Sequence, residues 1–226
     1  MLFIVSTPIG NLDDISLRQA KTLISSDIIL AEDTRSAQIL IDAIQKRFAL
    51  TVKNNMKIIS YYREKEFEKL PEVIEWLKQN KNISLISESG SPLVSDPGYL
   101  LVKTCVKEKI PLTVIPGPSA VISALTISGF DPSQFMFLGF FPKKQSEKNK
   151  LVHKLMSVKI SFPEVVFVFY ESAQRIDETL RSFPPQWNPE IAICREITKK
   201  FEEVARGKTS ELVGKQYKGE ITVLVK

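Results

Sequence analysis

Glycine, proline and small hydroxyl residues gather in three short segments of the sequence. STPIGN covers residues 6–11, SESGSPLVSDPGY covers residues 87–99, and PGPSA covers residues 116–120. Glycine lets a backbone approach a ligand closely, proline fixes the turn, and exposed backbone N–H groups can hold a carboxylate. A tight turn explains any one of these segments equally well. Each follows a predicted strand, however, and three such loops at one edge of a parallel sheet indicate a ligand site.

Several carboxylates and arginines have residue types suited to acid–base or phosphate chemistry. The candidate catalytic residues are Asp33, Arg35, Glu88, Glu171, Arg175 and Glu196. A carboxylate can take a proton from a weak nucleophile, and an arginine can hold a phosphate with two hydrogen bonds. Structural roles stay open for the same residues. Asp33 could cap a helix, and Glu171 and Arg175, four residues apart, could form an exposed ion pair that contributes about 0.3–0.5 kcal/mol.

A basic segment lies in the C-terminal half. Residues 143–159 contain six lysines and one acidic residue, Glu147, in a chain whose net charge is +5. A solvated surface is the commoner explanation of such a segment, and binding of an anionic partner such as RNA is the more specific explanation. The residues expected to contact RNA are Lys143, Lys144, Lys148, Lys150, Arg195 and Lys199. We expect the neighbouring aromatic side chains to lie mostly in the core, with base stacking as the alternative; they are Phe135, Phe137, Phe140 and Phe141.

Composition excludes several other kinds of site. The single histidine, His153, rules out a His-based zinc site, and Cys105 and Cys194 lie far apart, as suits a reducing cytoplasm. GxGxxG and GxxxxGK[ST] are absent, so neither the usual dinucleotide site nor a P-loop is expected. No apolar segment approaches the roughly 18 residues of a membrane span, and no basic region precedes the first apolar segment. We therefore expect a cytoplasmic protein without a metal site.

The elements that must position these residues alternate between strand-like and helix-like patterns in the first half. Such alternation predicts βαβ units and a mainly parallel sheet. The second half has more strands and fewer helices, which indicates a mixed sheet. We therefore predict two α/β domains, residues 1–115 and 116–226, with a ligand cleft between them. The predicted strands cover residues 2–6, 27–31, 57–61, 83–87, 112–115, 134–141, 165–170, 191–195 and 220–225, with a further one at 201–205.

Taken in order, the motifs of the chain resemble those of the tetrapyrrole methylase family. STPIGNLDDIS, AEDTR, SESGSPLVSDPGY and PGPSAVISAL follow one another, and GFFPKK, FYESAQR and REITKKFEE extend the resemblance towards the C-terminus. Each motif is weak alone, but the ordered set is specific and covers nearly the whole chain. Within the family, the set is similar to the branch that methylates a cytidine 2′-oxygen of 16S ribosomal RNA in the small subunit.

The resemblance implies an S-adenosylmethionine-dependent methyltransferase of two α/β domains, with the cofactor in the interdomain cleft. It also implies a homodimer that acts on 16S ribosomal RNA or on the 30S subunit. Glu88, Ser89 and Ser91 stand where the family usually has Asp, Ala and Thr. The cofactor contacts that the resemblance implies are Pro8, Ser87, Glu88, Ser89, Gly90, Ser91, Pro92, Ser119, Ala120, Phe140 and Gly219.

Two other hypotheses stay open. The first is methylation of a tetrapyrrole or another small molecule. The second is a non-catalytic, RNA-binding protein of ribosome assembly. The basic segment and the FYESAQR and REITKK motifs favour RNA over a small molecule, and the intact glycines and prolines of the loops favour a catalytic protein.

Overall fold

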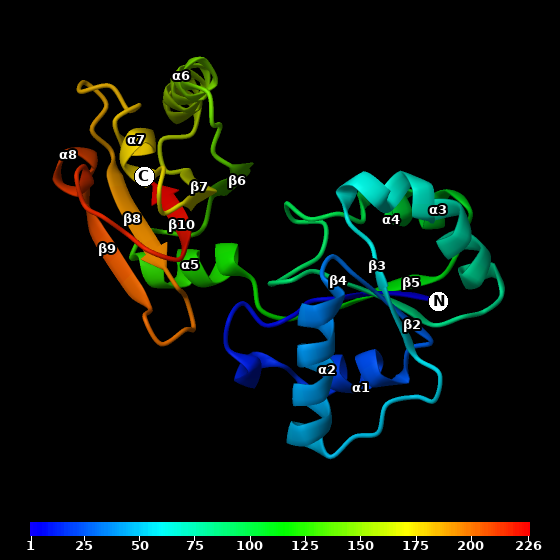
Figure 1. Cartoon of the computed structure of the whole chain (residues 1–226). Helices are drawn as coiled ribbons and strands as arrows, with labels where there is room; N and C mark the ends of the chain where they lie inside the picture. The colour runs from blue at the N-terminus through cyan, green and yellow to red at the C-terminus, as the bar shows by residue number, and fades with distance from the viewer. The chain divides into compact units, whose positions relative to one another are not determined.

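The computed structural model describes the whole chain, Met1 to Lys226, as two compact units. The first unit covers Met1–Ser119 and the second covers Ala120–Lys226. Both are α/β, as predicted, and each is coloured along the chain in Figure 1. No helix in the chain has the length and apolar character that crossing a bilayer would require.

The first unit contains a five-stranded, fully parallel sheet in the order β3-β2-β4-β1-β5. This confirms the parallel sheet expected from the alternating pattern. Because every strand runs the same way, the loops that follow them all leave at one edge. The strands are β1 (Leu2–Val5), β2 (Ile28–Ala31), β3 (Lys57–Ser60), β4 (Ile83–Ile86) and β5 (Leu112–Ile115).

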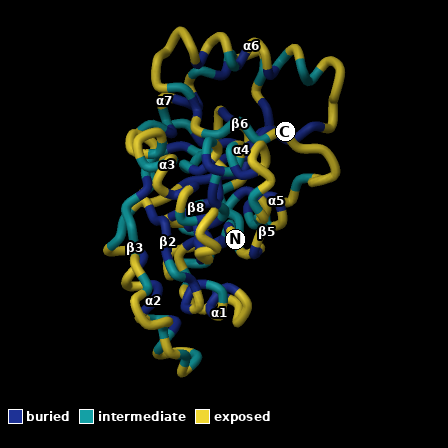
Figure 2. The backbone as a smooth tube through the Cα atoms, turned by 90° about the vertical axis from the view of Figure 1, so that its right-hand side faces the viewer, coloured by how far each residue is buried: buried dark blue, intermediate teal, exposed yellow.

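Helices cover both faces of this sheet, and Figure 1 shows α1 and α2 on one side with α3 and α4 on the other. The central strands are therefore buried on both faces, and β2 and β4 contain no exposed residue. Ser16 and Gln19 form a capping box that begins α1. Figure 2 shows the α2 backbone alternating between buried and exposed residues, as an amphipathic helix does. The helices are α1 (Leu17–Ser25), α2 (Thr34–Phe48), α3 (Arg63–Lys78) and α4 (Tyr99–Lys107).

The second unit contains a five-stranded mixed sheet in the order β6-β7-β10-β8-β9. Only the β6–β7 pair is parallel, which confirms the predicted change of sheet type. The elements are α5 (Ala120–Ser128), β6 (Phe135–Phe140), α6 (Gln145–Ser161), β7 (Val166–Ser172), α7 (Ile176–Leu180), β8 (Glu190–Arg195), β9 (Glu203–Lys208), α8 (Thr209–Leu212) and β10 (Glu220–Val225).

The core of the second unit lies mainly between this sheet and α6, α7 and α8. Helix α5 packs against β10, β8 and β9. The expectation that the phenylalanines of residues 135–141 are mostly core is wrong. Phe141 is buried, but Phe135 and Phe140 are exposed and Phe137 is half-buried. The reason is that β6 is an edge strand, so its side chains have a packed neighbour on one side only.

Candidate functional site

The loops after β1 and β4 are joined at the carboxyl edge of the parallel sheet. Thr7 and Gly90 exchange two backbone hydrogen bonds, of 2.8 and 3.2 Å. The Thr7 hydroxyl donates to the Ser87 carbonyl at 3.1 Å, and the Ser87 hydroxyl donates to the Gly90 carbonyl at 3.0 Å. The hydroxyl residues that sequence analysis singled out therefore hold the two loops in one fixed arrangement.

The loop after β5 packs against the same place. The Ser6 and Ser91 hydroxyls lie 3.1 Å apart, and the Gln19 amide donates to the Ser6 carbonyl at 2.6 Å. A Cβ atom on Gly117 would lie 2.2 Å from the Gln19 amide nitrogen, so any other residue there would have to displace the Gln19 side chain. Gly90 has a φ of +84°, and a Cβ atom on it would lie 3.6 Å from the Pro118 carbonyl oxygen. The predicted meeting of three loops at one edge is thus confirmed, whereas the role of Gln19 was missed.

Among the expected cofactor contacts of this unit, some backbone groups are covered and others open. As whole residues, Pro8, Ser87, Gly90 and Pro92 are buried, whereas Glu88 and Ser89 are exposed. Ser91 and Ser119 are intermediate. The hydroxyl hydrogen bonds and the glycines fix the backbone of these loops, and a fixed backbone suits the polar ends of a ligand such as S-adenosylmethionine.

Two carboxylates beside these loops act on a third. Glu32 follows β2, Glu88 follows β4, and Asp96 lies further along the same loop as Glu88. Burial, strengthened by the negative charges of Glu32 and Glu88, raises the pKa of Asp96 to about 6, against an opposing effect of Arg63. Sequence analysis quoted the loop that contains Asp96 but did not select this residue, because its proximity to Glu32 is visible only in the fold.

Asp33 has the structural role that was left open for it. Its carboxylate accepts a hydrogen bond from the Arg35 backbone N–H at 2.7 Å and caps α2. The Arg35 side chain is exposed. The geometry therefore explains Asp33 as a helix cap and leaves Arg35 accessible to a partner.

Glu171 and Arg175 form an ion pair, but not the exposed pair considered above. The Glu171 side chain is 0% exposed, and its Oε1 lies 2.6 Å from Arg175 Nη2. The same oxygen accepts from Arg175 Nε at 2.9 Å and from the Ser172 N–H at 2.7 Å, and Oε2 accepts from the Thr179 hydroxyl at 2.6 Å. Both carboxylate oxygens are thus engaged in the turn from β7 into α7.

Arg195, Glu196 and Lys199 likewise belong to a local network. Arg195 donates to the carbonyl of Lys218 at 2.7 Å and to that of Phe201 at 3.1 Å. Glu196 accepts from the Glu220 N–H at 2.9 Å and lies 3.2 Å from the Lys199 ammonium. The Glu220 hydrogen bond is the main cause of a lowered pKa at Glu196.

Gly219 makes this network possible. Its φ is +87°, and a Cβ atom on it would lie 2.4 Å from the Glu196 carboxylate. The structure therefore brings Gly219 and Glu196 together, although sequence analysis had given them separate roles.

Phe140 is another expected cofactor contact of this unit. It is exposed on β6, and its ring centroid lies 5.4 Å from that of Tyr170.

The basic segment divides into exposed and buried lysines. Lys143, Lys144 and Lys150, which we call the α6 lysine cluster, are exposed. Lys148 is 0% exposed and lies 2.8 Å from Glu178, so the expectation that it contacts RNA phosphates is corrected. Its position explains the burial, because Val152 and Leu155, four and seven residues later on α6, face the same core. His153, on the same helix, is exposed.

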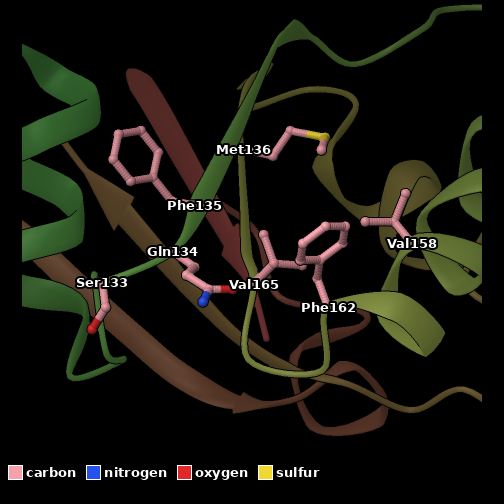
Figure 3. Close-up of a pocket in the computed structure, with 7 residues that line it drawn as sticks. All are labelled: Ser133, Gln134, Phe135, Met136, Val158, Phe162 and Val165. Carbon is pink, nitrogen blue, oxygen red and sulfur yellow. The ribbon is translucent and has the colours of Figure 1, made fainter.

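A separate hollow of about 380 Å³ lies in the second unit. In Figure 3, Met136 points to the side where Val158, Phe162 and Val165 gather, and Phe135 points the other way. Ser133 and Gln134 supply its polar groups, and none of its lining residues is ionisable. This hollow offers no acid–base chemistry. The candidate site therefore remains the three joined loops of residues 6–11, 87–99 and 116–120, which we call the loop cluster.

With this geometry described, comparison with known proteins identifies the class. Residues 1–213 match the family described as Tetrapyrrole (Corrin/Porphyrin) Methylases. The chain therefore belongs to the tetrapyrrole methylase family, and it is a methyltransferase whose methyl donor is S-adenosylmethionine.

Individual curated relatives are similar to the chain over nearly its whole length. The chain is 38% identical over 229 residues to "Ribosomal RNA small subunit methyltransferase I" of Thermotoga maritima, covering 99% of this chain and 97% of the relative. It is 36% identical to the protein of the same name from Bacillus subtilis, covering 100% of this chain and 74% of the relative.

Solved structures agree on the fold. The methyltransferase CobJ matches with a TM-score of 0.69 and 14% identity, over 99% of this chain and 92% of CobJ. Diphthine synthase matches with a TM-score of 0.70 and 14% identity, over 99% of this chain and 88% of that protein. At this identity the likeness supports the fold alone, and it confirms the predicted pair of α/β domains of the tetrapyrrole methylase type.

Proposed function

We propose that this chain methylates the ribose 2′-oxygen of a cytidine in 16S ribosomal RNA, using S-adenosylmethionine. The joined loops after β1, β4 and β5 carry the catalytic part of the proposal, since they form a rigid, glycine-containing cluster at the ligand-binding edge of a parallel sheet. The RNA substrate is supported by relatives at 36–38% identity named for small-subunit ribosomal RNA. The AEDTR, FYESAQR and REITKK motifs resemble those of the branch that methylates a cytidine 2′-oxygen, and this resemblance supports that oxygen as the methyl acceptor.

In this proposal the loop cluster holds the cofactor. Residues 87–92 and Pro8 would contact its methionine end, and Ser119 and Ala120 would contact it from the start of α5. Phe140 and Gly219 would contact its adenosine end. When bound, S-adenosylmethionine supplies a methyl group on a positively charged sulfur, which needs no metal for activation. Nowhere in the structure do three or more His, Cys, Asp or Glu side chains form a group that could hold a metal ion.

The chain must also deprotonate and align a ribose hydroxyl. This hydroxyl is a weak nucleophile at neutral pH, so a carboxylate within hydrogen-bond reach accelerates its attack. Among the carboxylates beside the loops, Asp96 fits this role best, because a pKa of about 6 leaves it ionised at neutral pH and still able to accept a proton. Glu88 is the second candidate. Asp33, Glu171 and Glu196 already serve helix capping or local networks, so we propose structural roles for them.

RNA binding in this proposal uses the exposed cations. The α6 lysine cluster and the Arg35 side chain are accessible, whereas Arg195 and Lys199 are engaged with groups of neighbouring segments, among them the Lys218 carbonyl and the Glu220 carboxylate. The role we propose for Arg175 is structural: its guanidinium would hold the Glu171 carboxylate in place. The family resemblance further supports a cytoplasmic homodimer as the working form.

The decisive experiment supplies labelled S-adenosylmethionine to naked 16S RNA and to 30S particles from a strain that lacks this gene. The RNA is then digested to nucleosides and separated. Label in 2′-O-methylcytidine, with protection of the adjacent phosphodiester from alkali, is the expected result. Label in a methylated base, or in a co-purified tetrapyrrole, contradicts the proposed substrate.

A further inference from the structure

Two large aromatic side chains are exposed at the start of neighbouring helices in the first unit. Phe67, in the second turn of α3, is 81% exposed, and Tyr99, the first residue of α4, is 65% exposed. We call them the aromatic pair. A single exposed apolar residue needs no explanation. These two differ because both belong to helices that begin at the carboxyl edge of the parallel sheet, where the loop cluster lies.

One side chain fixes the two helix starts to each other. Glu66, adjacent to Phe67, accepts hydrogen bonds from the backbone N–H groups of Gly98 at 3.2 Å and Leu100 at 3.0 Å, on either side of Tyr99. Helices α3 and α4 also pack together. The aromatic pair is therefore held on a rigid support, and Gly98 ends the loop that contains Ser87 and Asp96.

A cation lies beside one ring of the aromatic pair: the Lys103 ammonium is 5.8 Å from the centroid of the Tyr99 ring. At the start of α3, the Lys65 ammonium is 5.5 Å from the ring centroid of Tyr62, which is half-buried. Aromatic faces next to ammonium groups are the combination that single-stranded nucleic acids use, since bases stack on the rings while phosphates meet the cations. Glu64 and Glu68 are exposed on the same part of α3 and offset its positive charge. Duplex binding depends mainly on contacts between cations and phosphates. With its positive charge offset, this surface is poorly suited to that mode of binding.

We propose that the aromatic pair stacks on unpaired bases of the RNA that flank the methylated nucleotide. This proposal rests on the proposed function and adds to it a surface that binds unpaired RNA. A nucleotide that enters a methylation site must leave its own stack, and neighbouring bases held on aromatic rings keep it extended.

The test compares Phe67→Ala, Tyr99→Ala and the double variant with Val106→Ala, a control on α4 whose residue is as exposed as Tyr99. The first readout is the KM for 30S particles, and the second is binding of a short, fluorescein-labelled, unpaired oligoribonucleotide. Because stacking contributes about 1–3 kcal/mol per base, each alanine variant should raise the KM and the Kd about tenfold. Phe67→Trp should retain binding, and affinity for S-adenosylmethionine and for duplex RNA should not change.

The outcomes separate this surface from the proposed function. Unchanged KM and Kd in the double variant, while the wild type methylates RNA, overturn the stacking surface alone. Oligoribonucleotide binding that depends on the aromatic pair, in a wild type that methylates no RNA, overturns the proposed reaction alone. If the double variant sediments as a monomer where the wild type is a dimer, the surface is an interface between copies and the stacking proposal is wrong.

Discussion

Replacing Glu171 should destabilise the second unit without removing a catalytic group. In Glu171→Ala, the Arg175 guanidinium, the Thr179 hydroxyl and the Ser172 N–H lose an acceptor inside the protein. Breaking a buried ion pair by removing one partner costs about 3–5 kcal/mol. Since 1 kcal/mol corresponds to about 2–4 °C in a chain of this size, we expect the melting temperature to fall by about 10 °C. Glu171→Gln keeps the shape and should lose less.

The chain contains a matched control for this experiment. Arg181 and Asp177 have the same four-residue spacing and lie 2.8 Å apart, but both side chains are exposed. Arg181→Ala should therefore change stability by only about 0.3–0.5 kcal/mol. Thermal unfolding and steady-state kinetics well below the transition would be measured on all three variants. A Glu171→Gln protein with wild-type melting temperature and a hundredfold lower kcat would refute the structural role and return Glu171 to the catalytic candidates.

Three further predictions concern the loop cluster and the RNA surface. Gly117→Ala should weaken S-adenosylmethionine binding in calorimetry, because its Cβ atom would displace the Gln19 amide. Gly214→Ala strains a backbone with a φ of +86°, but its Cβ atom meets nothing within 4 Å, so it should leave that affinity intact. The kcat should rise with pH through about 6 and then level off as Asp96 ionises, and Asp96→Asn should lose this step and at least about a hundredfold in rate. A rate that rises through pH 6 in the Asn variant would contradict that assignment. Neutralising all three residues of the α6 lysine cluster should reduce the slope of log K for RNA against log salt by about 2, and an unchanged slope would make the cluster ordinary solvated surface.

The strands and the loop cluster were predictable because their signals are local. Alternating apolar segments mark the strands, and glycine, proline and serine mark the turns that follow them. A parallel sheet then brings consecutive loops to one edge regardless of the exact strand order. The burial of Lys148 also had a local signal, since it shares a helical face with Val152 and Leu155, but the number of lysines around it drew attention to charge instead.

Other features depend on which segments meet in space. Asp96 acquires its pKa from burial and from Glu32, some sixty residues away in sequence, and Glu66 reaches the backbone of Gly98 from a different helix. Whether the Glu171–Arg175 pair is exposed or buried depends on how α7 packs against the sheet. The i,i+4 spacing predicts the pair itself but carries no information about its surroundings.

The carboxylates of Asp96 and Glu196 are held in opposite ways, and this difference bears on where we propose that proton transfer occurs. Glu196 accepts a hydrogen bond from the Glu220 N–H and lies beside the Lys199 ammonium, which lower its pKa and make it a poor proton acceptor. Glu171 is buried, and both of its carboxylate oxygens accept hydrogen bonds from neighbouring groups. Asp96 is partly buried near two negative charges, which favour uptake of a proton. Pairs of like groups whose surroundings separate their pKa values commonly mark the division between structural and acid–base roles. On this reasoning, we propose that proton transfer belongs to the loop edge of the first unit, and that Glu171 and Glu196 serve the architecture of the second unit.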